Sequence, residues 1–113
     1  MVNVHRGLDL EVLKASNKSW DRLTITEETY KNEYYMEHKH ILPEARYIVD
    51  GKGRFDVRDE NDKWVRLTVE KGDYIEIPGG TYHRFSLHGS GYIDVIRLFG
   101  GVPEWTPIFR KRD

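Results

Sequence analysis

The stretch His38-Lys39-His40-Ile41-Leu42-Pro43-Glu44 carries the residues that decide both the fold and the site. Side chains two positions apart on a β-strand point to the same face, so His38 and His40 are expected to project together. Pro43 cannot donate to a strand ladder and predicts a bend that aims Glu44 at the same point. Neutral imidazoles and a carboxylate are good donors for transition-metal ions, so this spacing indicates part of a metal site.

A second stretch, Pro78-Gly79-Gly80-Thr81-Tyr82-His83, supplies a further donor. His83 follows a Pro-x-Gly turn and shares a predicted strand face with Phe85 and Leu87. It should therefore reach the same point from the opposite sheet of a barrel. Tyr82 should face the other side of its strand and serve only the structure. The two stretches together predict a centre of three histidines and one glutamate, which leaves two positions of an octahedron open.

From Tyr34 onward the chain reads as β-strands separated by turn signals at intervals of about ten residues. This spacing predicts an antiparallel sandwich or barrel rather than alternating βαβ units. We therefore predict an all-β fold, a small jelly-roll barrel or double-stranded β-helix whose interior can hold one ligand. The turn signals lie at residues 50–53, 59–62, 70–73, 78–80 and 88–91.

Apolar residues within the predicted strands give the expected core. Residues 8–13 carry too few apolar positions to separate helix from strand, and a short helix is the expectation there. The side chains expected to be buried or half-buried are Tyr47, Val49, Phe55, Val57, Val65, Leu67, Val69, Ile75, Ile77, Phe85, Leu87, Ile93, Val95 and Phe99.

The length of 113 residues and the 33% share of charged residues are typical of one folded domain. We divide it into an N-terminal segment (1–29), a barrel over about 30–107 and a basic tail (108–113). The formal net charge is −1 with scattered basic residues, so no nucleic-acid partner is predicted. The absence of cysteine excludes disulfides and thiolate chemistry.

The sequence also bears on location. No apolar run approaches the roughly 18 residues that span a membrane, and no signal-peptide core is visible. We therefore expect a cytoplasmic protein, also nuclear if eukaryotic, without a membrane partner.

The spacing of the candidate ligands resembles the two signature motifs of the cupin superfamily. The motifs read His38-x-His40-x-x-x-Glu44-x-x-x-x-x-x-Gly51 and Gly72-x-x-x-x-x-Pro78-x-Gly80-x-x-His83. The second motif commonly ends in an asparagine, and this chain has Leu87 at that position. The asparagine is not a metal ligand, so its replacement leaves the ligand set intact. The resemblance implies a single cupin-type barrel domain.

More specific stretches are similar to the acireductone dioxygenase family within that superfamily. The similarity covers about residues 33–107. The stretches that carry it are Arg46-Tyr47-Ile48, Gly53-Arg54-Phe55-Asp56-Val57-Arg58-Asp59, Trp64-Val65-Arg66, Glu70-Lys71-Gly72-Asp73, Tyr82-His83-Arg84-Phe85, Arg97-Leu98-Phe99 and Pro103-Glu104-Trp105-Thr106-Pro107.

The resemblance implies a role for each matching residue. Arg46 matches a catalytic and substrate-binding arginine close to the metal. Phe85 and Trp105 match aromatic residues that line the substrate pocket. One Fe²⁺ or Ni²⁺ ion per chain, without an organic cofactor, is implied at four ligands: His38, His40, Glu44 and His83.

The implied activity is that of a metal-dependent dioxygenase in methionine salvage, with an acireductone and O₂ as small-molecule partners. The substrate would be 1,2-dihydroxy-5-(methylthio)pent-1-en-3-one. Iron implies formate and 4-methylthio-2-oxobutanoate as products, whereas nickel implies CO, formate and methylthiopropionate. The chain is expected to act as a monomer.

Two departures from the family keep alternatives open. Leu42 and Pro43 stand where the family usually carries acidic residues, so a proton acceptor would be Glu37, Glu76 or solvent. The segment before His38 is also shorter than is typical. There are two alternatives. The first is a cupin dioxygenase or isomerase for another enediol or a β-diketone, and the second is a metal-binding protein with little turnover. At single residues, Arg46 could instead support Glu44, and both pocket aromatics could simply pack.

Overall fold

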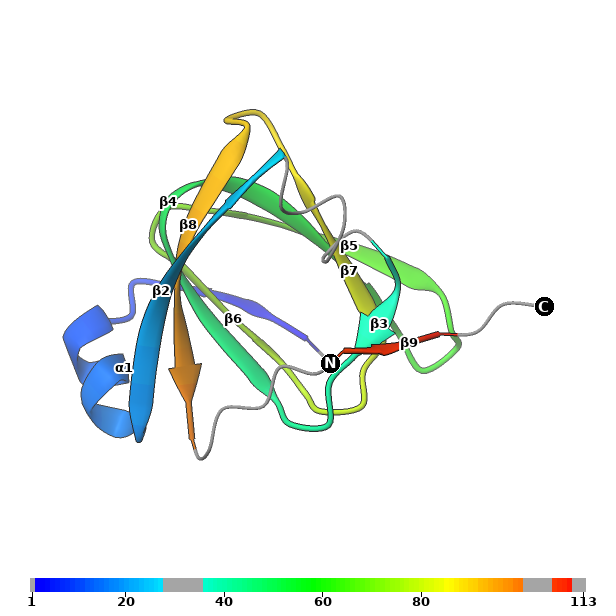
Figure 1. The fold of residues 1–113 in the computed structure, drawn as a ribbon, viewed down its shortest axis with the longest axis horizontal. Helices are drawn as coiled ribbons and strands as arrows, with labels where there is room; N and C mark the ends of the chain where they lie inside the picture. The colour runs from blue at the N-terminus through cyan, green and yellow to red at the C-terminus, as the bar shows by residue number, and fades with distance from the viewer. Residues whose placement is uncertain (1, 28–35, 101–106, 111–113) are drawn as a thin grey trace.

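The computed structural model describes residues 2–27, 36–100 and 107–110. Within these residues the chain forms β-strands and one short helix, and every strand pair is antiparallel (Figure 1). The predicted all-β class is confirmed. In chain order the elements are β1 (Val4–Arg6), α1 (Leu10–Ser16), β2 (Ser19–Thr26), β3 (His38–Lys39), β4 (Glu44–Arg58), β5 (Trp64–Glu70), β6 (Asp73–Ile77), β7 (His83–Leu87), β8 (Tyr92–Phe99) and β9 (Ile108–Phe109).

Strand β4 belongs to both sheets of the barrel. Its first half pairs with β6 and β8, and its second half pairs with β5 and β7. One sheet therefore has the order β1-β6-β4-β8-β2, and the other has the order β5-β4-β7-β3-β9. Figure 1 shows the two sheets facing one another, with β2, β8 and β6 on one side and β7 and β3 on the other.

The turn predicted at residues 50–53 is wrong, because β4 runs through it without a break. The strand bends there instead: its register with β8 shifts between Ile48 and Asp50, and Gly51 has a φ of +83°. A Cβ atom at Gly51 would lie 2.3 Å from the carbonyl oxygen of Tyr92. Glycine here serves a close strand-to-strand approach at a bulge, which local sequence cannot distinguish from a turn.

The bulge also changes which residues of β4 face the interior. Before it the buried positions are Glu44, Arg46 and Ile48, and after it Gly53, Phe55 and Val57 are buried. Asp56 is also buried, but on the other face, where Arg66 and Arg84 cover it. An extra residue in a strand has this effect, because side chains alternate with a period of two. The other four turn signals coincide with connections between strands, as predicted.

The core lies between the two sheets. Most of the predicted apolar positions are buried or half-buried, but Val65 is 41% exposed, so that prediction is wrong. Val65 belongs to β5, which pairs only with β4 among the described strands and so lies at the edge of its sheet. The buried cluster consists of Ile25, Ile48, Phe55, Val57, Val69, Ile75, Ile77, Phe85, Ile93 and Val95.

The N-terminal residues contribute two strands to the barrel, whereas the sequence placed its start near residue 30. Strand β1 pairs with β6, and all eight residues of β2 pair with β8. Ile25 of β2 is 1% exposed and packs in the core cluster. Residues 1–29 carry none of the five turn signals from which the barrel strands were predicted.

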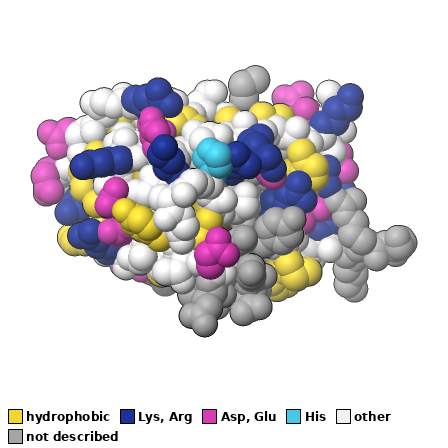
Figure 2. Space-filling model, turned by 90° about the horizontal axis from the view of Figure 1, so that it is seen from above, with side chains coloured by type: hydrophobic (Ala, Val, Ile, Leu, Met, Phe, Trp, Pro, Cys, Tyr) yellow, Lys and Arg dark blue, Asp and Glu magenta, His cyan; other side chains and the backbone are white. Residues whose placement is uncertain are grey.

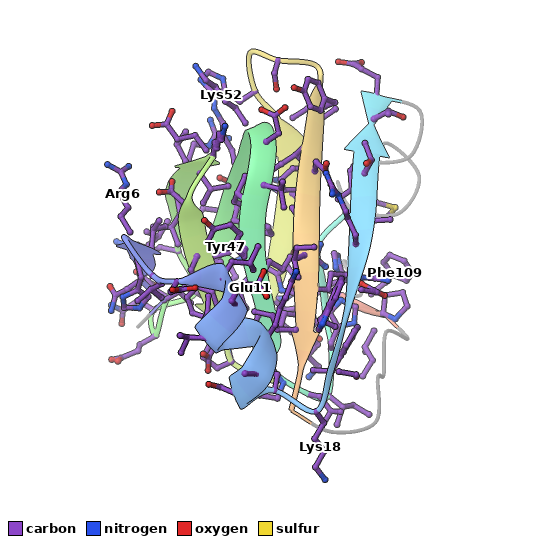
Figure 3. All side chains as sticks on the ribbon, turned by 90° about the vertical axis from the view of Figure 1, so that its left-hand side faces the viewer. Arg6, Glu11, Lys18, Tyr47, Lys52 and Phe109 are labelled. Carbon is purple, nitrogen blue, oxygen red and sulfur yellow. The ribbon has the colours of Figure 1, made fainter. Side chains whose placement is uncertain are left out.

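The predicted short helix is present but begins later than expected. It starts after Asp9, whose carboxylate accepts hydrogen bonds from the backbone N–H groups of Glu11 and Val12. An aspartate at this position satisfies donors that the first helical turn leaves unpaired. Figure 3 shows α1 lying outside the strands, and none of its residues is buried.

The surface carries interspersed charges on the face in Figure 2. Basic and acidic side chains lie beside one another there, with smaller hydrophobic patches between them. Among the described residues, no helix has both the length and the apolar character needed to cross a bilayer.

Candidate metal centre

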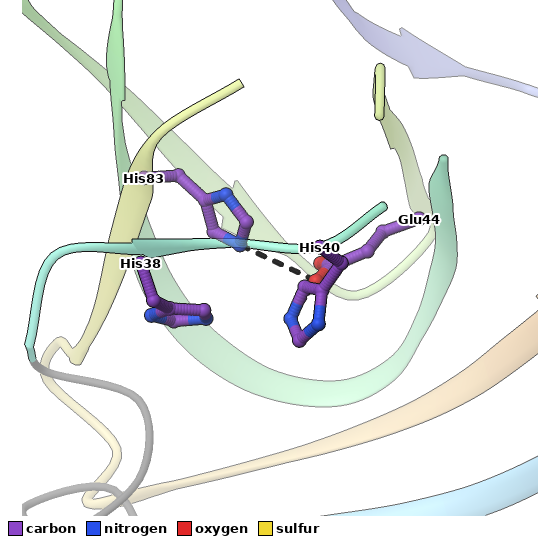
Figure 4. Close-up of side chains that lie close together, drawn as sticks. All are labelled: His38, His40, Glu44 and His83. Carbon is purple, nitrogen blue, oxygen red and sulfur yellow. Dashed lines mark ion pairs between the residues drawn. The ribbon is translucent and has the colours of Figure 1, made fainter. Parts of the chain in front are cut away.

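Four titratable side chains predicted to act together converge on the inner side of the barrel. His38, His40, Glu44 and His83 are each at most 7% exposed. One donor atom from each lies within 4.8 Å of the donors of the other three (Figure 4). Atoms at this separation can share one cation, so the group could hold a divalent metal ion.

The strands and sheets that carry these four residues differ from those predicted. His38 and His83 are directly opposite one another on β3 and β7, so both come from the same sheet. The prediction that His83 enters from the opposite sheet is therefore wrong. Glu44 makes that crossing, because it begins β4 where this strand pairs with β6. His40 follows the end of β3 instead of lying on it, and the bend predicted before Glu44 is present.

The hydrogen bonds of two rings direct their other nitrogens toward the centre. Nδ1 of His38 lies 2.7 Å from the carbonyl oxygen of Met36, and Nδ1 of His83 lies 2.9 Å from that of Thr81. A carbonyl oxygen only accepts, so each Nδ1 carries a hydrogen, and in a neutral ring this leaves the lone pair of Nε2 to face the centre. Burial is the main cause that lowers the pKa of His38 to about 4, so this ring is neutral at pH 7.

Glu44 supplies the negative charge of the centre. Its burial alone would raise its pKa, but the charge of Arg46 and hydrogen bonds from His40 and His83 outweigh this and hold the pKa well below its usual range. The Oε1 atom lies 2.6 Å from Nε2 of His40 and 3.3 Å from Nε2 of His83. The two imidazole nitrogens and this carboxylate oxygen lie close enough together to share one cation.

Arg46 lies next to the group, as the sequence predicts. It is 4% exposed, and its Nη2 atom is 3.5 Å from Oε2 of Glu44. The structure adds Arg97, which was not predicted as a site residue. Arg97 is the direct partner of Arg46 on β8, and the carboxylate of Asp21 accepts two hydrogen bonds from it at 2.7 and 2.6 Å. The alternation of β8 could have placed Arg97 on the inner face, but not opposite Arg46.

The other predicted pocket residues have different outcomes. Phe85 is 3% exposed, and its ring centroid lies 4.9 Å from that of Phe55, so it packs in the core two positions from His83. Trp105 lies outside the described residues. Leu42 and Pro43 are exposed and do not belong to the group.

Neither carboxylate considered as a proton acceptor faces the metal group. The side chain of Glu37 binds Arg58 and Arg110, and that of Glu76 accepts a hydrogen bond from Tyr74. His5 and His88, the other two histidines of the chain, are not members of the group.

An antiparallel double-sheet barrel with three histidines and a glutamate on its inner side defines the cupin class of metal-binding proteins. Comparison with protein families gives a more specific result. The model of the ARD/ARD' family matches residues 7–107, and the chain belongs to this family.

Individual relatives carry the same family name. Acireductone dioxygenase of Gallus gallus is 47% identical over 111 residues, covering 91% of this chain and 61% of the relative. The Rattus norvegicus protein of that name is 44% identical over 110 residues, covering 91% of this chain and 62% of the relative. The chain thus spans about three-fifths of the length of these curated relatives.

Solved structures support the fold. Acireductone dioxygenase from Bacillus anthracis, described with a cadmium ion in its active centre, matches with a TM-score of 0.75 at 27% identity, covering 88% of this chain and 61% of that one. A Bacillus subtilis oxalate decarboxylase variant matches with a TM-score of 0.64 at 16% identity, covering 96% of this chain and 27% of that one. The second similarity is one of fold alone.

Proposed function

We propose that this chain is a metal-dependent acireductone dioxygenase with His38, His40, Glu44 and His83 as the ligands of one divalent ion. The convergence of these four buried side chains beside the guanidinium of Arg46 carries the proposal. Membership of the ARD/ARD' family and similarity to relatives named acireductone dioxygenase support the same activity.

The charges around the centre suit an anionic substrate. An ionised enediol carries negative charge, which the buried cation of Arg46 would balance. Arg97, oriented by Asp21, would add a second guanidinium from the neighbouring strand. Such contacts are stronger in a water-poor interior than in solution. A divalent ion at the four ligands would supply Lewis acidity and a template for the substrate oxygens.

The absence of an acidic side chain beside Glu44 bears on the protonation state of the substrate. Pro43 has no titratable group, and the carboxylates of Glu37 and Glu76 are engaged elsewhere. We therefore propose that the substrate binds as an anion that has already lost its proton to solvent. A substrate bound in this form would not need a dedicated base beside the metal ligands.

Fe²⁺ and Ni²⁺ are the proposed ions. Intrinsic affinity at nitrogen and oxygen donors favours nickel over iron, while metal supply and site geometry can reverse the occupancy. With iron the expected products are formate and 4-methylthio-2-oxobutanoate, and with nickel CO, formate and methylthiopropionate. Loading the same protein with each ion should therefore give chemically distinct products.

The decisive experiment separates binding from turnover. An acireductone added without oxygen to iron- or nickel-loaded protein should shift its ultraviolet absorption, and admitted oxygen should bleach it. Metal-free protein serves as the control and should do neither. A shift without bleaching would instead indicate a metal-binding protein with little turnover. Failure of both would favour another enediol or a β-diketone as substrate.

Cytoplasmic or nuclear location, a monomeric state and the lack of nucleic-acid and membrane partners stay predictions from the sequence. Size-exclusion chromatography with light scattering would test the monomer directly.

A further inference from the structure

The strand that carries His38 is too short to fix this side chain through its own ladder. Strand β3 has two residues, and only His38 pairs with β7. Its other neighbour, β9, also has two residues. By contrast, β7 pairs with β4 along its whole length, which holds His83 firmly. The position of His38 must therefore depend on contacts outside the strand ladder.

Glu37 provides such contacts on the outer face of the sheet. Its carboxylate accepts hydrogen bonds from Nε and Nη2 of Arg58 at 2.7 and 3.3 Å, and from Nη1 of Arg110 at 3.1 Å. Its backbone carbonyl accepts a further bond from the N–H of Arg110 at 3.1 Å. The side chains of Glu37 and Arg58 are only 11% and 14% exposed, so this pair is partly shielded from solvent.

Both arginines are themselves anchored. Arg58 donates to the carbonyl oxygen of Asp62 at 2.9 Å, and its guanidinium carbon lies 3.8 Å from the ring centroid of Trp64. Arg110 donates to the two carboxylate oxygens of Asp62 at 2.6 and 2.8 Å. The network thus ties the segment before β3 to the β4–β5 connection and to the residue after β9. A bidentate, ring-stacked arginine is a more rigid anchor than an exposed ion pair.

The residue on each side of Glu37 belongs to the metal centre or supports it. His38 follows it, and the carbonyl of Met36 precedes it and accepts the Nδ1 hydrogen of His38. Holding Glu37 therefore holds both the backbone that carries the ring and the acceptor that orients it. Loss of the hydrogen-bond partner of a metal-ligating histidine commonly costs about 10- to 100-fold in metal affinity, and Glu37 holds the segment that carries this partner.

We propose that Glu37 is a positioning residue, which aims the imidazole of His38 at the metal centre through its ties to Arg58 and Arg110. This inference rests on the proposed metal-dependent function. It assigns Glu37 a role different from that of a proton acceptor, because its carboxylate faces away from the ligands.

Metal affinity of Glu37→Gln tests the proposal against a purely structural role. The matched control is Asp56→Asn, since Asp56 also binds two arginines, Arg66 and Arg84, but lies within the long strand β4. The readouts are the dissociation constant for Co²⁺, measured against a competing chelator, its visible spectrum, and the thermal midpoint of the metal-free protein. Both variants should lose thermal stability. Only Glu37→Gln should weaken Co²⁺ binding by about tenfold or more and alter its spectrum.

A double-mutant cycle tests whether the effect passes through His38. In a His38→Ala background, Glu37→Gln should no longer change the residual Co²⁺ affinity. If Glu37→Gln alone leaves affinity within twofold of the parent, or if its effect persists without His38, the proposal is overturned. Should Glu37→Gln not fold, Arg110→Gln removes one arm of the network and should weaken binding severalfold, and an unchanged affinity would count against the proposal. A parent protein that binds no Co²⁺ would instead overturn the proposed metal centre itself.

Discussion

His38 and His83 face one another across two antiparallel strands, and both rings are oriented in the same way. In each case Nδ1 contacts the carbonyl oxygen two positions earlier in the chain, that of Met36 or of Thr81. The ring centroids lie 4.5 Å apart. Two backbone carbonyls thereby direct Nε2 of each ring toward the centre, so these two candidate ligands are preorganised in the protein alone.

Replacing His83 should therefore lower the amount of metal bound per chain. We expect His83→Ala to bind well below one equivalent of Fe²⁺ or Ni²⁺ after dialysis, because three ligands hold an ion less tightly than four. Elemental analysis gives the stoichiometry. His88→Ala is the matched control, since His88 contacts Arg54 outside the group and its loss should leave occupancy unchanged. Full metal retention in His83→Ala would refute its assignment as a ligand.

Arg46 should serve the substrate more than the metal. In Arg46→Leu the four ligands remain, so we expect metal occupancy at pH 7 close to that of the parent. Loss of a buried guanidinium beside the site should raise KM for the acireductone about tenfold or more. Arg22→Leu is the control, because Arg22 pairs with Asp94 and is not in the metal group. Parental kinetics in Arg46→Leu would leave Arg46 only a supporting role for Glu44.

Gly51 should be the less replaceable of two glycines with similar backbone conformations. Gly51 and Gly72 have φ of +83° and +90°, but only a Cβ at Gly51 would collide with backbone atoms of Tyr92 and Ile93. We expect Gly72→Ala to lower the free energy of unfolding by about 1–2 kcal/mol, from backbone strain alone. Gly51→Ala should lower it by roughly 3 kcal/mol or more, because strands β4 and β8 must separate. Urea unfolding measures both, and equal losses would exclude the collision as the cause.

The metal-free protein should lose stability on mild acidification. His38 has a folded pKa of about 4, below its ordinary value of 6.5, so between these pH values the unfolded chain binds a proton that the folded chain does not. Stability contributed by neutral His38 is therefore present above pH 6.5 and is lost as the pH falls toward 4, by at most roughly 3 kcal/mol.

Urea unfolding of metal-free protein between pH 7 and pH 4 measures this loss. His38→Asn has no titrating ring at this position, so its stability should fall less steeply over the same interval. An identical pH dependence in the two proteins would show that His38 titrates normally in the folded chain. Metal binding would obscure the effect, so a chelator must be present throughout.

Local sequence was sufficient for the identity of the candidate site. The spacing of His38, His40 and Glu44, followed by the Pro-x-Gly turn before His83, selected the four residues that the fold brings together. Their role could be predicted because histidine and glutamate are good metal donors and because the alternation of side chains along a strand is a local property. The all-β class and four of the five turns follow from similarly local patterns.

Only the tertiary structure decided how the sheets and the site are assembled. The change of inward-facing residues between Ile48 and Phe55, the pairing of His38 with His83, and the contacts of Glu37 all depend on neighbouring strands distant in sequence. A glycine at a bulge cannot be distinguished from a glycine in a turn by local sequence, because the difference depends on the neighbouring strand. Local side-chain patterns therefore specify which residues can act together, while register between strands, which is a non-local property, determines which of them meet.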